Sequence, residues 1–160
     1  MTAGVSGEVV LTEVADTEDF GRSLATTLRA GDLVILDGPL GAGKTALSRG
    51  IGAGLGVVGR VTSPTFVIAR AHRASEPGRP GMVHVDAYRL GGSEPGSDTG
   101  VDLLDELDAL DLDTDLRDSV VVVEWGAGVA ERLAARHLLV RLSREPESEV
   151  RHARWRWVDA

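Results

Sequence analysis

The segment that most constrains the fold is an apolar run, Leu33 to Leu36, that leads directly into a glycine-rich stretch. The stretch is GPLGAGKT at residues 38–45, which matches the pattern G-x-x-x-x-G-K-[ST]. After it, apolar residues recur at helical spacing. An apolar run predicts a strand covered on both faces, and a strand, glycine loop and helix in this order are typical of a phosphate-binding loop. The sequence therefore predicts a P-loop NTPase-like fold.

Lys44 stands out because it is the only lysine among seventeen basic residues. Its compact ammonium group can reach between phosphates, where a planar guanidinium would not fit. A chain with one lysine also lacks a separate Asn-Lys-x-Asp motif, with which Ras-type GTPases recognise guanine, so ATP is the predicted nucleotide. We expect the hydroxyl of Thr45 to bind Mg²⁺. The candidate nucleotide-binding residues of the loop are Gly38, Gly41, Ala42, Gly43, Lys44, Thr45 and Ala46.

Alternating strand and helix patterns along the chain predict a three-layer α/β/α fold, with a mostly parallel central sheet and antiparallel additions. We expect one domain over residues 1–160, with a core at about 8–142 and a C-terminal strand extension at 143–160. Asp16 is expected to cap the first helix. The other expected strands are 8–14, 65–71, 82–85, 120–123, 137–142 and 150–158, and the other expected helices are 103–110 and 129–135.

Composition limits the function classes. A net charge of −8 disfavours direct binding to nucleic acid, so any role with RNA is expected to be indirect. The chain has no cysteine and no long apolar span, so we expect a cytoplasmic protein that does not bind membranes. The C-terminal alternation of arginine with Trp155 and Trp157 could contact RNA, but it fits better an ordinary strand with the tryptophans packed on one face.

Two acids stand where a phosphate loop needs a carboxylate near its metal. Asp86 ends the strand pattern in MVHVDAYR, and Glu124 ends that in VVVVEWG. One could bind Mg²⁺ while the other orients the attacking water, and either could instead be an acid that faces solvent. His84 is expected to pack on its strand. Thr65, in the SPTF stretch, is either a switch residue that senses the γ-phosphate or part of a turn.

Four motifs in order, GPLGAGKT, VTSPTF, HVDAYRL and VVVEWG, resemble those of the bacterial TsaE (YjeE) family over about residues 8–142. The resemblance implies an ATPase that uses Mg²⁺ and acts with the TsaD–TsaB heterodimer, which modifies adenosine in tRNA to threonylcarbamoyladenosine. It also implies that Lys44 and Thr45 hold phosphate and metal, and that Thr65 lies in a switch-like segment. Asp86, Glu124 and Trp125 would line the active site.

The chain departs from the family pattern at Pro39, where the family commonly has aspartate. Proline removes one backbone N–H from the loop, which predicts altered affinity or loop geometry. The segments 74–80 and 91–100 are also longer than a minimal member needs.

Two other function classes stay open. A small-molecule or nucleotide kinase would need cations over its acceptor, which Arg70, Arg73, Arg79 and Arg89 could supply. A binding module would use ATP as a switch without hydrolysing it. No arginine is evidently placed in the sequence to complete the site, so we expect partners to accelerate a slow ATPase.

Overall fold

The computed structural model describes residues 6–39, 41–59, 61, 69–86, 118–124 and 136–159. Within these residues no helix is long and apolar enough to span a membrane. The helices and strands that they form are, in chain order, β1 (Ser6–Leu11), α1 (Val14–Ala25), β2 (Leu33–Asp37), α2 (Lys44–Leu55), β3 (Ala69–His72), β4 (Gly81–Asp86), β5 (Ser119–Glu124), β6 (Arg136–Arg144) and β7 (Arg151–Asp159).

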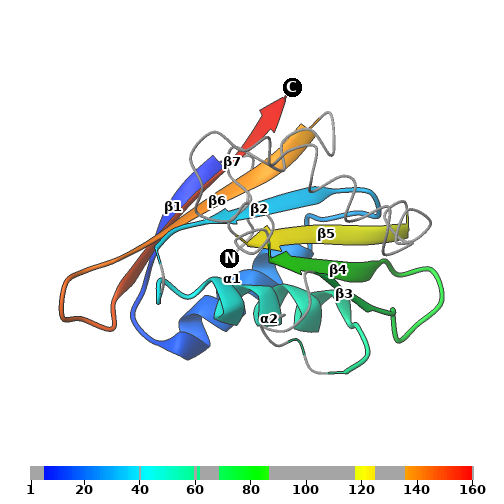
Figure 1. The fold of residues 1–160 in the computed structure, drawn as a ribbon, viewed down its shortest axis with the longest axis horizontal. Helices are drawn as coiled ribbons and strands as arrows, with labels where there is room; N and C mark the ends of the chain where they lie inside the picture. The colour runs from blue at the N-terminus through cyan, green and yellow to red at the C-terminus, as the bar shows by residue number, and fades with distance from the viewer. Residues whose placement is uncertain are drawn as a thin grey trace.

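The strands form one sheet in the order β1-β7-β6-β2-β5-β4-β3 (Figure 1). The central strands β6, β2, β5 and β4 run parallel, whereas β1, β7 and β3 pair antiparallel with their neighbours. The predicted α/β class and its mostly parallel sheet with antiparallel additions are confirmed. Helices α1 and α2 pack together against one face of the sheet. The predicted helices at 103–110 and 129–135 lie outside the described residues.

Close packing explains the glycines of α2, which lower its intrinsic helix propensity. A Cβ atom at Gly50 would lie 2.1 Å from the carbonyl oxygen of Glu18 in α1, and one at Gly54 would lie 2.6 Å from the Cβ of Ala25. The glycines therefore let the two helix backbones approach closely. Phe20, Leu24 and other buried apolar residues complete this core beneath β2.

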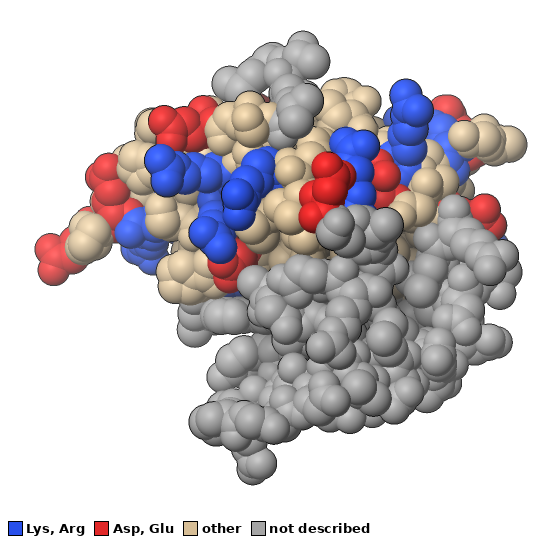
Figure 2. Space-filling model, turned by 90° about the horizontal axis from the view of Figure 1, so that it is seen from above, with Lys and Arg blue, Asp and Glu red and all other residues tan. Residues whose placement is uncertain are grey.

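Strand β7 has the alternation expected of an ordinary strand. Trp155 is buried and its ring centroid lies 4.9 Å from that of Phe20, while Arg154 and Arg156 are exposed on the other face. Arg154 pairs with Glu8 at 3.0 Å. Figure 2 shows several arginine side chains gathered on this face, with acidic side chains beside them. This arrangement supports the strand interpretation of the C-terminal segment.

Two local contacts add detail to the elements that the sequence predicts. Asp16 takes part in capping α1, but from the third helical position: Glu13 is the N-cap, and the Asp16 side chain accepts a 3.0 Å hydrogen bond from the backbone N–H of Glu13. The segment 74–80, which is longer than a minimal member of the family needs, is tied to the end of α2. There Arg79 donates a 3.0 Å hydrogen bond to the carbonyl of Gly54, and Ser75 donates to Gly56. The segment satisfies carbonyl groups that a helix C-terminus leaves without partners.

Candidate nucleotide-binding site

The glycine-rich loop lies between the end of β2 and the start of α2, as the sequence predicts (Figure 1). Gly41 and Gly43 have φ angles of 82° and 103°, in the left-handed region that favours glycine. Gly43 is the N-cap of α2, so the first N–H groups of the helix face the loop. Ala42 is buried and Ala46 is half-buried on the helix. The loop therefore has the backbone geometry needed to bind an anion.

Lys44 folds back over the loop. Its side chain is buried, and Nζ donates hydrogen bonds to the carbonyl oxygens of Gly38 at 2.5 Å and Pro39 at 2.9 Å. The Pro39 carbonyl also accepts from the N–H of Ala42 at 3.1 Å. Pro39 lacks an N–H, yet its carbonyl takes part in holding the loop closed. The ammonium group is thus placed as a point charge within the turn.

Glu124, at the end of β5, lies next to the start of α2. Thr45 Oγ1 donates to Glu124 Oε1 at 3.3 Å, and Ser48 Oγ lies 3.4 Å from Glu124 Oε2 and 3.0 Å from the carbonyl of Lys44. His84 Nε2 contacts the same Oε2 atom. Glu124 and His84 are both buried, so Glu124 is not an acid that faces solvent. A hydroxyl and a carboxylate side by side are oxygen donors of the kind that Mg²⁺ prefers, so this part of the site fits that ion.

The other candidate residues are placed to different extents. Asp86 ends β4 and pairs in register with Glu124 on the neighbouring parallel strand, which brings the two backbones together. The side chain of Asp86 is not among those described, and Thr65 and Trp125 lie outside the described residues. Their roles therefore stay predictions. Arg73 and Arg79 lie beyond the C-terminal end of α2, about 17 Å along the helix from the loop, which argues against a role at the phosphates.

The sequence interpretation missed two residues that position Glu124. His84 is packed, as expected, but its ring also fixes the carboxylate, and its Nδ1 has no hydrogen-bond partner among the described residues. Ser48 lies one helical turn after Lys44 and faces the same carboxylate. The position of Ser48 could have been predicted from sequence, because residues four apart on a helix lie on the same face. The contact between His84 and Glu124 could not be predicted in this way, because it requires β4 to pair with β5.

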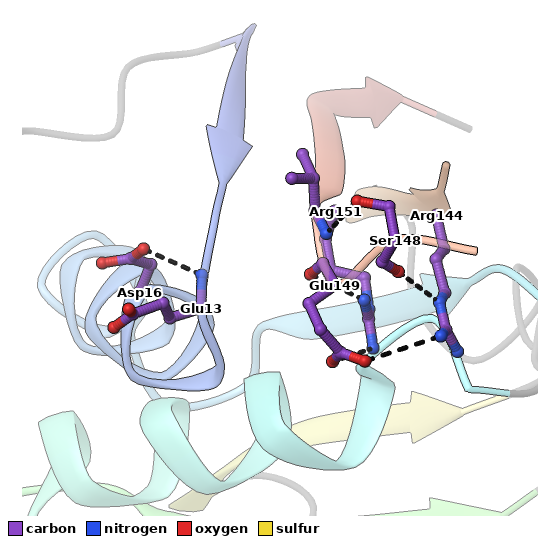
Figure 3. Close-up of polar contacts among 7 residues, drawn as sticks. Glu13, Asp16, Arg144, Ser148, Glu149 and Arg151 are labelled. Carbon is purple, nitrogen blue, oxygen red and sulfur yellow. Dashed lines mark hydrogen bonds and ion pairs between the residues drawn. The ribbon is translucent and has the colours of Figure 1, made fainter. Parts of the chain in front are cut away.

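The sequence interpretation also missed Arg144 and Arg151. These residues are far from the loop in sequence, but the β6–β7 hairpin places them beside it (Figure 3). A Cβ atom at Gly41 would lie 3.7 Å from Arg144 Nη1, and one at Gly43 would lie 3.9 Å from Arg151 Nε. Both guanidinium groups therefore lie against the loop. Nothing in the sequence pattern indicates that these two arginines lie near the phosphate loop.

A separate cavity of about 820 Å³ borders the first residues of the loop on the outer side of the sheet. Its lining includes Gly38, Pro39, Leu142 and Arg154, but not Lys44 or the carboxylate beside it. The donors that fit phosphate and metal lie outside this cavity, so we place the candidate site at the loop itself.

Comparison with known proteins gives a consistent result. The family model "Threonylcarbamoyl adenosine biosynthesis protein TsaE" matches residues 11–153. The TsaE protein of Mycobacterium tuberculosis is 56% identical over 151 residues, which cover 94% of this chain and 87% of that protein. The TsaE protein of Streptomyces coelicolor is 56% identical over 137 residues, covering 84% and 85%.

The fold is also that of a solved relative. The crystal structure of Bacillus subtilis YdiB superposes with a TM-score of 0.68 at 23% sequence identity, covering 97% of this chain and 86% of that one. At this identity the structural likeness supports the fold alone. The family match across most of the sequence and the identity to named relatives lead to one conclusion: the chain belongs to the TsaE family.

Proposed function

We propose that this chain is the ATP-binding and ATP-hydrolysing subunit of the machinery that makes threonylcarbamoyladenosine in tRNA. The observation that carries the proposal is the contact between Thr45 and Glu124 beside a lysine-bearing phosphate loop. Family membership gives the pathway, because the relatives are named for threonylcarbamoyladenosine biosynthesis. A cytoplasmic location fits this role.

In the proposed mechanism the loop N–H groups and Lys44 bind the β- and γ-phosphates. Thr45 and Glu124 would hold Mg²⁺, which supplies positive charge to the phosphate oxygens when bound. His84 and Ser48 keep the Glu124 carboxylate in place. Asp86, at the same edge of the sheet, is the candidate for orienting the attacking water, as a second carboxylate at the end of a neighbouring parallel strand.

The proposed partners are TsaD and TsaB, with tRNA reached through that complex. The net charge of −8 supports an indirect contact with RNA, since the chain has no excess of positive charge to attract phosphates. On the face shown in Figure 2 arginines lie beside acids, and Arg141 pairs with Asp37 at 3.5 Å. We therefore propose that docking to the protein partners, rather than to RNA, accelerates hydrolysis.

The test is single-turnover ATP hydrolysis by the purified chain in three mixtures: alone, with TsaD–TsaB from the same source, and with TsaD–TsaB plus tRNA. We expect slow hydrolysis by the chain alone and an increase of at least about tenfold with TsaD–TsaB. Lys44→Ala is the control for contaminating ATPases. ATP binding without hydrolysis in every mixture would replace this proposal with a nucleotide-switched binding module. Equal rates in all three mixtures would refute partner activation.

A further inference from the structure

The β6–β7 hairpin continues past the end of β2 and runs beside the phosphate loop (Figure 1). A Cβ atom at Gly38 would lie 2.5 Å from the carbonyl oxygen of Leu142, so the loop begins in direct contact with β6. Two residues further along β6, Arg144 pairs across the strands with Arg151 of β7. The two arginines therefore stand opposite each other at the turn end of the hairpin, next to the phosphate loop.

A single carboxylate lies between the two guanidinium groups. Glu149 Oε1 is 3.6 Å from Arg144 Nη2, and Glu149 Oε2 is 3.8 Å from Arg151 Nη2 (Figure 3). Backbone carbonyls fix the two arginines more tightly: Arg144 Nε donates to Ser148 at 2.7 Å and Arg151 Nη1 donates to Glu149 at 2.7 Å. Because the Glu149 side chain is 75% exposed and its ion pairs are long, another anion could displace it at little cost.

The two arginines lie on the side of the loop that is opposite to Glu124. Strand β2 lies between β5, which ends at Glu124, and β6, which ends at Arg144. A metal held at this site would supply positive charge to the β- and γ-phosphates. If Thr45 and Glu124 hold the metal, the γ-phosphate belongs to the β5 side. The rest of the nucleotide then extends toward the β6–β7 hairpin.

We infer that Arg144 and Arg151 bind phosphate oxygens of the nucleotide on the side away from the metal, at its α- and β-phosphates. The inference rests on the proposed function, since it assigns residues to the same ATP site. Guanidinium groups suit this role because their planar N–H donors match pairs of phosphate oxygens. The phosphates would take the place of the Glu149 carboxylate between the two arginines.

This arrangement predicts an effect on affinity rather than on turnover. The α- and β-phosphates are present in both ATP and ADP, so the arginines bind both nucleotides in the same way. Contacts that are equal in the ground state and the transition state lower KM without raising kcat. Arg144→Ala and Arg151→Ala should each weaken ADP and ATP binding about tenfold, while kcat at saturating ATP stays within about threefold.

The experiment is a titration of each protein with a fluorescent ADP analogue, repeated over a range of NaCl concentrations, with kcat and KM for ATP measured in parallel. Arg154→Ala is the matched control, because Arg154 lies on the same hairpin and pairs with one exposed glutamate, Glu8 of β1, but points to the outer face. We expect weaker binding and a shallower salt dependence in the Arg144 and Arg151 variants, and parental values in the control. Arg144→Lys should recover part of the affinity, because it restores the charge.

The possible results separate this inference from the proposed function. If the parent chain binds ADP and ATP but the Arg144 and Arg151 variants bind them equally well, the inference fails and the proposed function stands. A fall in kcat with unchanged ADP affinity would place the arginines at the γ-phosphate and overturn the inference. Weaker binding with an unchanged salt dependence would show that the arginines only support the loop, and would also overturn it. A parent chain that binds neither nucleotide would remove both proposals.

Discussion

Glu124→Gln is the substitution that most directly tests the metal side of the site. The amide has nearly the same size as the carboxylate, but one oxygen becomes an NH₂ group. Glu124 Oε2 lies against His84 and Ser48, while Oε1 faces the hydroxyl of Thr45 at 3.3 Å. If the amide oxygen of the glutamine stays as the acceptor toward His84, its NH₂ group faces Thr45. A donor then stands where the site would bind a cation.

The magnitude follows from this geometry. One negative charge and one oxygen ligand are lost at the metal, and losses of this kind cost roughly a hundredfold in rate, or about 2.7 kcal/mol of activation free energy. The loop and Lys44 are unchanged, so ATP binding should persist. Unfolding free energy should fall by only about 1–2 kcal/mol, because the buried hydrogen bond to His84 survives as a neutral one.

The assay is ATP hydrolysis in the presence of TsaD–TsaB as a function of Mg²⁺ concentration, together with nucleotide binding and thermal unfolding. We expect a hundredfold lower kcat and a higher Mg²⁺ requirement. Glu8→Gln is the matched control, since Glu8 is an exposed strand glutamate paired with Arg154. Turnover by Glu124→Gln within twofold of the parent, with the same Mg²⁺ requirement, would remove Glu124 from the metal site.

Three further predictions concern the loop, the helix packing and the first helix. Lys44→Ala and Lys44→Arg should both abolish measurable ATP binding, and parental binding by the arginine variant would refute the steric argument for lysine. Gly50→Ala should lower the unfolding free energy by about 2 kcal/mol and Tm by roughly 6 °C, measured by thermal unfolding, because the added Cβ meets the backbone of Glu18. Alanine has the better helix propensity, so a stabilised variant would contradict this packing argument. Hydrogen bonds from Thr12 and Glu13 lower the pKa of Asp16. Its stabilising effect is therefore full above the ordinary carboxyl pKa and is lost as pH falls through the lowered value, so the parent and Asp16→Asn should differ in unfolding free energy at about pH 7 and converge near pH 2.

The phosphate loop could be predicted from sequence because its determinants are local. An apolar run, glycines at fixed spacing and a following helical pattern all lie within residues 33–55, and each constrains the backbone directly. The parallel strands β4 and β5 were found for the same reason. Asp86 and Glu124 were identified because each ends one of these apolar strands, and the structure shows that the two strands are neighbours in the sheet.

The parts that sequence did not reveal depend on contacts between distant segments. Ser48 meets Glu124 across a separation of 76 residues, and the Arg144 and Arg151 side chains reach the loop only because β6 pairs with β2. The capping role of the segment 74–80 was missed because its composition resembles that of a mobile loop, while the docking of Arg79 on Gly54 depends on the position of α2. Local patterns carry no information about such pairings.

The placement of β2 between β5 and β6 divides the proposed site into two parts with separate tasks. Glu124, Thr45 and Ser48 stand on the β5 side, and Arg144 and Arg151 stand on the β6 side. Within the described part of the chain, the hydrogen bonds and ion pairs of each group stay on its own side. Groups that do not contact each other, and that act on different parts of the nucleotide, are expected to contribute nearly additively to free energy. The loss of kcat/KM in Glu124→Gln combined with Arg144→Ala should therefore equal the product of the two single losses. A deviation of more than about threefold would mean that the two sides act on each other through the loop, so that nucleotide affinity and hydrolysis could not be adjusted independently.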